Sequence, residues 1–218
     1  FRPHLPWYAP RKYFDLYPID EIQLPELNGK DLLDVPLQGI QLSSARRNEF
    51  QNIKKQGKWK EAIQAYLASI SFADAQLGRV LTALEESVYA ADTIIVLWSD
   101  HGWHLGEKNH WHKSTLWEEA TRIPFMVFVP GMTKGGTRCQ RPVDLLCVYP
   151  TLIELCGLKP RRALDGVSIV PLLKNPEIEW KIPAVTEFKR GQCAVRSERF
   201  RYIRYSDGTE ELYDHLKD

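Results

Sequence analysis

The run Thr93-Ile94-Ile95-Val96-Leu97-Trp98 decides the fold. Its apolar and β-branched residues do not alternate with polar ones, which is typical of a strand buried on both faces. The polar residues Ser99-Asp100-His101-Gly102 follow it directly. Because ligands of open α/β sheets bind beyond the carboxyl ends of the strands, we expect an α/β fold with a functional site that begins at Asp100.

The sequence on both sides of this run predicts the rest of an α/β core. Apolar residues recur at steps of three and four residues over 58–88, which indicates an amphipathic helix. A second buried strand is expected at Pro124–Val129, and a second helix at Val143–Leu158. We expect a parallel core of strands flanked by these helices.

The two ends of the chain have a different character. Residues 1–50 contain six prolines, which favour an irregular segment, and we expect this segment to border the functional site. Near the carboxyl end, turn residues separate four short runs that are typical of strands, at 184–188, 193–197, 202–205 and 211–213. The sequence therefore predicts three parts: an irregular segment at 1–50, the α/β core at 51–175 and a small antiparallel sheet subdomain at 176–218.

The composition argues against two classes of function. The 218 residues include 29 Lys and Arg and 28 Asp and Glu, for a net charge of +1, whereas nucleic-acid-binding domains are usually strongly basic. No apolar run approaches the roughly 20 residues that cross a bilayer. We therefore expect neither a nucleic-acid partner nor a membrane partner. The four cysteines form no C-x-x-C pair, so they leave the compartment open.

Reactive side chains gather in residues 99–113. Four of the six histidines lie here, together with Asp100, Glu107 and Lys113. An adjacent carboxylate and imidazole at the end of a strand suit a divalent metal ion, so Asp100 and His101 are candidate metal ligands. Taken one at a time, such residues more often cap turns, face solvent or pack in a core. Their concentration in one short segment favours a site.

Several motifs together resemble a known family. Ser99-Asp100-His101-Gly102 is followed by Leu105-Gly106-Glu107, by Lys113 and by Arg122-Ile123-Pro124-Phe125, and Arg2-Pro3-His4 stands near the start. In this order and spacing they resemble the carboxyl-terminal part of the type I sulfatases of the alkaline phosphatase superfamily, in particular the iduronate-2-sulfatase-like branch. The resemblance covers nearly the whole chain. It implies part of a mixed sheet flanked by helices, with a small antiparallel subdomain at the carboxyl end.

The resemblance implies a role for each candidate residue. Asp100 and His101 resemble ligands of a single calcium ion, although calcium prefers oxygen ligands and His101 leaves the identity of the metal open. Lys113 and His4 resemble the two residues that contact the sulfate, and His4 would also protonate the leaving oxygen. Trp103 and His104 are expected to border the substrate.

The family also implies a nucleophile that this sequence does not supply. Type I sulfatases use a formylglycine made from the Cys or Ser of a C/S-x-P/A-x-R motif in their amino-terminal half. None of the four cysteines begins such a motif, and Ser43-Ser44-Ala45-Arg46 does not match it. We therefore expect the carboxyl-terminal part of a sulfatase, inactive alone, whose complete form hydrolyses a sulfate ester of a sugar. A half-fold would expose sheet edges and apolar surface, so the expected partner is the amino-terminal half or a second copy.

Two other functions stay open. A metal-dependent phosphodiesterase or phosphonate hydrolase of the same superfamily would use more histidine ligands, and residues 101–112 offer them. A noncatalytic fragment or binding module would do without the nucleophile altogether. For the location, the resemblance implies the periplasm, the extracellular space or the lysosome.

Overall fold

The computed structural model describes residues 2–44 and 47–217, so Ala45 and Arg46 of the Ser43–Arg46 sequence lie outside the described residues. The chain folds into two compact units, each assembled from separate stretches of sequence. Unit 1 comprises residues 1–33, 43–93 and 103–113, and unit 2 comprises residues 34–42, 94–102 and 114–218. This division cuts across the three parts expected from the sequence, which stay a prediction.

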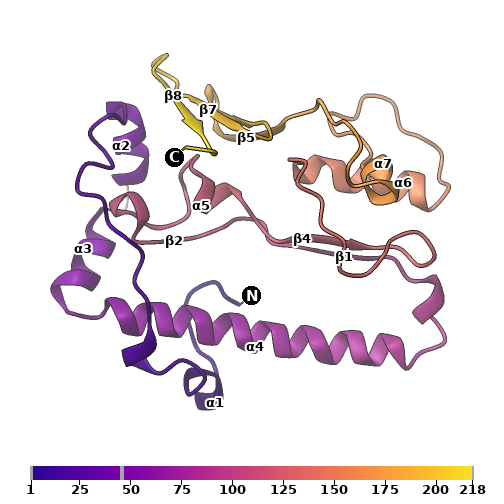
Figure 1. Ribbon diagram of the computed structural model, residues 1–218, viewed down its shortest axis with the longest axis horizontal. Helices are drawn as coiled ribbons and strands as arrows, with labels where there is room; N and C mark the ends of the chain where they lie inside the picture. The colour runs from indigo at the N-terminus through magenta and orange to yellow at the C-terminus, as the bar shows by residue number, and fades with distance from the viewer. Residues whose placement is uncertain (1, 45–46, 218) are drawn as a thin grey trace. The chain divides into compact units, whose positions relative to one another are not determined.

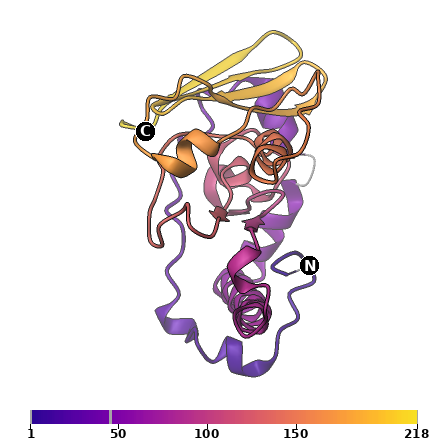
Figure 2. The ribbon, with the colours of Figure 1, turned by 90° about the vertical axis from the view of Figure 1, so that its right-hand side faces the viewer.

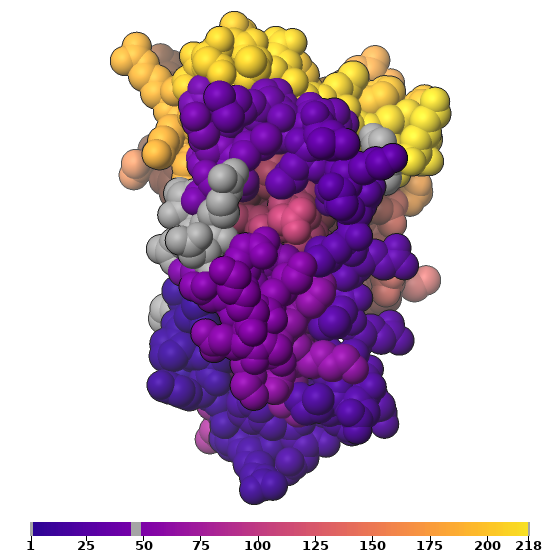
Figure 3. All heavy atoms as spheres, turned by 90° about the vertical axis from the view of Figure 1, so that its left-hand side faces the viewer, coloured from indigo at the N-terminus to yellow at the C-terminus, as the bar shows by residue number. Residues whose placement is uncertain are grey.

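Unit 1 is built along one long helix. The predicted helix over 58–88 is confirmed as α4 (Trp59–Glu85), and α1 (Arg11–Phe14) lies alongside it (Figure 1). The 3₁₀ turns η1 (Ile19–Glu21) and η2 (Ala90–Asp92) also belong to this unit. The helix α3 (Arg47–Lys55) contacts α4. In the space-filling view, both helices belong to the purple area of the surface (Figure 3). The core of the unit consists of Ile22, Phe50, Ile63 and Trp111.

Unit 1 also contains a short hairpin that packs against α4. Its strands β2 (His104–Leu105) and β3 (Trp111–His112) pair antiparallel, and the 3₁₀ turn η3 (Glu107–Asn109) connects them. Trp59 Nε1 donates a hydrogen bond of 2.7 Å to the carbonyl oxygen of Leu105. Gly106 has a φ of 137°, and a Cβ there would lie 2.6 Å from the Trp59 ring. Only glycine therefore lets the hairpin approach α4 this closely.

The two strands predicted from the sequence are present in unit 2, but in the described residues neither is buried on both faces, and their direction was predicted wrongly. The strands β1 (Ile95–Trp98) and β4 (Phe125–Phe128) pair antiparallel, with Ile95 opposite Phe128 and Trp98 opposite Phe125. The parallel core that we expected is therefore corrected: among the described residues, these two strands form an antiparallel ribbon. The apolar composition of the two strands carries no information on strand direction.

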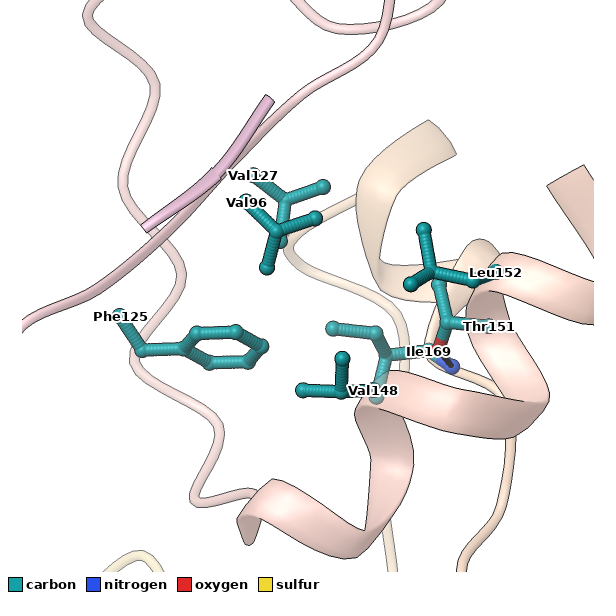
Figure 4. A pocket seen from close by; sticks show the side chains of 7 residues that line it. All are labelled: Val96, Phe125, Val127, Val148, Thr151, Leu152 and Ile169. Atoms are coloured by element: carbon teal, nitrogen blue, oxygen red, sulfur yellow. Dashed lines mark hydrogen bonds between the residues drawn. The ribbon is translucent and has the colours of Figure 1, made fainter. Parts of the chain in front are cut away.

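Helices cover one face of this ribbon. The helix predicted over 143–158 consists of η4 (Leu145–Cys147) and α6 (Val148–Leu155), and α7 (Val170–Lys174) follows. A small apolar gap remains between them and the ribbon, lined by Val96, Phe125, Val127, Val148, Thr151, Leu152 and Ile169 (Figure 4). Its one hydroxyl, Thr151 Oγ1, donates to the Cys147 carbonyl and accepts from the Ile169 amide. The gap offers no reactive group and belongs to the core.

The expected carboxyl-terminal sheet is confirmed. Its strands are β5 (Ala184–Lys189), β6 (Gln192–Arg196), β7 (Phe200–Arg204) and β8 (Glu210–Asp214). They pair antiparallel in chain order, and Figure 2 shows them as one orange and yellow sheet. The short helix α5 (Glu118–Thr121) begins with Glu118, which pairs with Arg201 of this sheet. The helix α2 (Leu37–Ser44) lies within the segment that we expected to be irregular.

Candidate functional site

The carboxyl end of β1 forms a tight turn in unit 2. The Ser99 hydroxyl donates to the carbonyl oxygen of His101 over 2.8 Å, and the Gly102 amide donates to the carbonyl oxygen of Ala120 over 2.8 Å. A Cβ on Gly102 would lie only 2.0 Å from the carbonyl oxygen of Glu119. The turn therefore requires glycine, and it fixes the backbone that carries Asp100 and His101.

Asp100 and His101 lie close together on this turn. His101 Nε2 is 3.7 Å from Asp100 Oδ2, and the Asp100 side chain is 82% exposed. His101 Nδ1 lies 2.8 Å from the carbonyl oxygen of Gly102. A carbonyl oxygen only accepts, so Nδ1 carries the proton, and in the neutral ring the lone pair lies on Nε2, on the side of Asp100.

This arrangement fits two ligands of a divalent cation. Histidines that bind metals commonly donate their second ring N–H to a carbonyl or carboxylate, as His101 does here. Asp100 supplies an accessible oxygen beside the basic nitrogen. Over residues 2–44 and 47–217, however, no group of three or more His, Cys, Asp and Glu side chains forms a complete cation site. The pair would thus supply part of a coordination sphere.

His4 and Trp103 belong to unit 1 and contact each other. Their ring centroids lie 5.9 Å apart with the planes nearly perpendicular, and His4 is exposed while Trp103 is buried. Trp7 holds the loop of His4: its Nε1 donates to the carbonyl oxygen of Pro3 over 2.6 Å, and its ring lies 5.8 Å from that of Trp103. The structure therefore brings two of the expected substrate-contacting residues together.

His104 is placed differently from the expected position beside the substrate. Its side chain is fully buried in unit 1, and its ring lies 4.9 Å from the ring of His110. Burial and the neighbouring His110 lower the pKa of His104 to about 3. A neutral imidazole with no exposed surface does not favour contact with a substrate, and it is better suited to packing within the unit.

We predict that this buried ring makes the stability of unit 1 depend on pH. Below pH 6.5 the unfolded chain takes up a proton that folded His104 accepts only near its pKa of about 3. The free energy of unfolding should therefore fall as the pH decreases from 6.5, by about 1.4 kcal/mol per pH unit at most. Urea unfolding between pH 8 and 4 should show a shallower slope for His104→Gln, with equal slopes above pH 7.5. Equal slopes over the whole range would contradict the prediction.

Lys113 ends the hairpin of unit 1 and is half-buried. His110 Nε2 lies 2.8 Å from the carbonyl oxygen of Lys113, so this nitrogen donates. The neighbouring His112 is buried, and its Nε2 contacts the Glu49 carboxylate of α3. Sequence reasoning missed Glu49, because a single acidic residue on a charged helix gives no signal of a partner so far along the chain.

The residues just after Lys113 are bound to the carboxyl-terminal sheet within unit 2. The Glu118 carboxylate pairs with Arg201 and lies 3.4 Å from Arg196 Nε. Trp117 Nε1 donates to Glu211 over 3.1 Å, and Tyr205 and Tyr213 donate to the same carboxylate. The half-buried carboxylate of Glu118 and the buried carboxylate of Glu211 thus join residues 117–118 to strands β6, β7 and β8. The sequence indicated the strands but gave no sign of these contacts.

Comparisons with known proteins give one consistent picture. A family model described as "Sulfatase" matches residues 2–158, and one described as "N-sulphoglucosamine sulphohydrolase, C-terminal" matches residues 106–218. A sulfatase of Formosa agariphila is 44% identical over the whole chain, and the chain covers 43% of that protein. Human iduronate 2-sulfatase is 29% identical over 97% of the chain, which covers 41% of it. The chain therefore spans less than half the length of these relatives.

A solved structure supports the fold. The phosphonate monoester hydrolase of Silicibacter pomeroyi superposes on the whole chain with a TM-score of 0.82 at 23% identity, and the chain covers 49% of it. At this level of identity the similarity concerns the fold alone. The mixed α/β architecture with a small antiparallel sheet is therefore as expected from the sequence. Because the sulfatase model matches most of the chain, the protein belongs to the sulfatase family.

Proposed function

We propose that this chain is the carboxyl-terminal part of an enzyme that hydrolyses sulfate esters, with a sugar as the sulfated substrate. The observation that carries the proposal is the turn after β1, where Asp100 and His101 lie side by side in a chain of the sulfatase family. The nucleophile would be a formylglycine in the amino-terminal part of the enzyme, outside these 218 residues.

In this proposal the Asp100 carboxylate and His101 Nε2 hold a divalent cation, with calcium as the first candidate. When bound, the cation would draw negative charge from the sulfate oxygens. Lys113 supplies a positive charge to the same group, and fixed charges of this kind act most strongly where water is excluded. His4, which is exposed on its loop, binds the sulfate and gives a proton to the leaving oxygen, as an imidazole can near neutral pH.

We further propose that the remainder of the enzyme covers the ribbon of β1 and β4. Trp98, Met126 and Phe128 are large apolar residues of this ribbon that are exposed in the described part of the chain. Two-stranded ribbons are rarely stable alone, and unpaired edges attract further strands. The amino-terminal half is the proposed partner, and a second copy of the chain is the alternative.

The proposed location is the periplasm, the extracellular space or the lysosome, in line with the sulfatase branch that the sequence resembles. In the described residues, no helix is both long and apolar enough to cross a bilayer. Fractionation of cells that produce the complete protein would test the location directly, if the protein is detected by a method that does not depend on its activity.

A metal-dependent phosphodiesterase or phosphonate hydrolase is the second candidate, because a phosphonate monoester hydrolase is one of the enzymes whose fold this chain shares. The complete protein should be assayed with an aryl sulfate and with a phosphonate monoester at equal concentrations. Preference for the sulfate, one bound cation and a mass deficit at one Cys or Ser would support a sulfatase. Preference for the phosphonate would favour the second candidate, and inactivity with no mass deficit would indicate a noncatalytic protein.

A further inference from the structure

The backbone on both sides of Lys113 has an unusual conformation. His112 has a φ of 81° and Ser114 has a φ of 73°, so two non-glycine residues adopt left-handed torsions directly next to Lys113. Each such residue costs on the order of 1 kcal/mol or more, and it persists only where its surroundings impose it. The fold therefore maintains strain at the two positions that set the direction of Lys113.

Side chains of unit 1 hold this strained backbone. The ring of His112 packs against Trp103 at a centroid distance of 4.5 Å, and its imidazole pairs with Glu49. His112 also stands opposite His104 in the hairpin register. His110 donates to the carbonyl oxygen of Lys113 itself. The position before Lys113 is thus fixed by ring packing, by the contact with the Glu49 carboxylate and by strand pairing.

A fixed backbone conformation is more important for the binding energy of a lysine than for that of most residues. The lysine side chain has four rotatable bonds, and its ammonium group gains little binding energy if the chain must first be ordered. Strain beside a charged residue is typical of functional positions, where it orients a group in advance. If the contacts served only to close the hairpin, a glycine at 112 or 114 would avoid the strain altogether.

We propose that Glu49, acting through His112, is a positioning residue for Lys113. The pair Glu49–His112 fixes the left-handed torsion at His112, and this torsion sets where the Lys113 ammonium group lies. The inference rests on the proposed function, since it assumes that Lys113 contacts the sulfate. Neither Glu49 nor His112 touches the substrate in this account.

A double-mutant cycle in the complete protein tests the proposal. Glu49→Gln and His112→Phe, which keeps a ring against Trp103, should each lower kcat about tenfold and leave KM nearly unchanged. In a Lys113→Ala background, Glu49→Gln should cause no further loss, because it acts only through Lys113. Glu49→Asp, which keeps the charge, should restore part of kcat. An equal loss in both backgrounds would overturn the proposal.

A readout that does not depend on turnover separates this inference from the proposed function. Acetylation of Lys113, followed by peptide mass spectrometry, should be several-fold faster in Glu49→Gln and His112→Phe than in the unchanged protein. Glu61→Gln is the matched control, because it removes an exposed carboxylate that pairs with Lys58 in the same unit. If the unchanged protein turns over no sulfate ester but Lys113 labelling rises, only the proposed function fails. Unchanged labelling of Lys113 would overturn the positioning role.

Discussion

Asp100→Ala in the complete protein is expected to abolish cation binding and sulfate-ester hydrolysis together, with activity falling by about a thousandfold or more. Asp100 is the proposed oxygen ligand in the turn after β1, and its Oδ2 lies 3.7 Å from His101 Nε2. Removing it leaves a single nitrogen, which hard cations such as calcium bind poorly. Because the side chain is 82% exposed, its loss should hardly affect folding.

A matched control lies at the other end of the same strand. Asp92 is an exposed aspartate in the 3₁₀ turn just before β1, and Asp92→Ala removes the same charge from the segment that precedes the strand. Bound metal measured by elemental analysis, together with turnover of an aryl sulfate, should be normal in Asp92→Ala and lost in Asp100→Ala. Full metal content or full activity in Asp100→Ala would show that this aspartate is no ligand.

The second large effect is expected on stability. Glu118→Ala should lower the free energy of unfolding by about 3–5 kcal/mol, because it leaves Arg201 buried without its counter-charge. The Arg201 side chain is only 5% exposed, and its Nη1 also donates to the carbonyl oxygen of Leu116. Burial tends to raise the pKa of Glu118, but Arg201 and Arg196 outweigh it, so the pKa lies below its usual value. The contribution of the pair is therefore present above pH 4.5 and is lost as the pH falls through this lowered pKa.

Urea unfolding followed by tryptophan fluorescence measures this effect. Glu198→Ala is the control, since Glu198 pairs with Arg141 at 2.6 Å but is half exposed, so its loss should cost less than about 1 kcal/mol. Replacing both Glu118 and Arg201 by Met should recover part of the stability, because the buried Arg201 charge is then removed together with its partner. A Glu118→Ala protein as stable as Glu198→Ala would show that the pair contributes little.

The fold could be predicted from the sequence wherever a local pattern determines it. Spacing of apolar residues predicted α4, and unbroken apolar runs predicted β1 and β4. The helices α1 and α2 were missed because proline was treated only as a breaker. Pro10 and Pro36 stand immediately before these two helices, where proline is well tolerated because the first helical amides need no partner.

The candidate site was predictable in its residue types and less so in its contacts. Asp100 and His101 are consecutive in the sequence, and the structure places their side chains near each other. The burial of His104 was not predictable, since a histidine in a polar segment looks the same whether it faces solvent or the core. The pairs Glu49–His112 and Glu118–Arg201 join residues that are distant in sequence, and no local pattern encodes them.

The alternation of the chain between its two units has a consequence for how such a protein can evolve. The chain passes from one unit to the other after Leu33, Leu42, Thr93, Gly102 and Lys113. Neither unit is a contiguous block, so recombination at a single junction cannot transfer one of them intact to another gene. Exchange of one whole unit would therefore need several simultaneous crossovers, whereas point changes and longer surface loops offer a simpler route to new specificities.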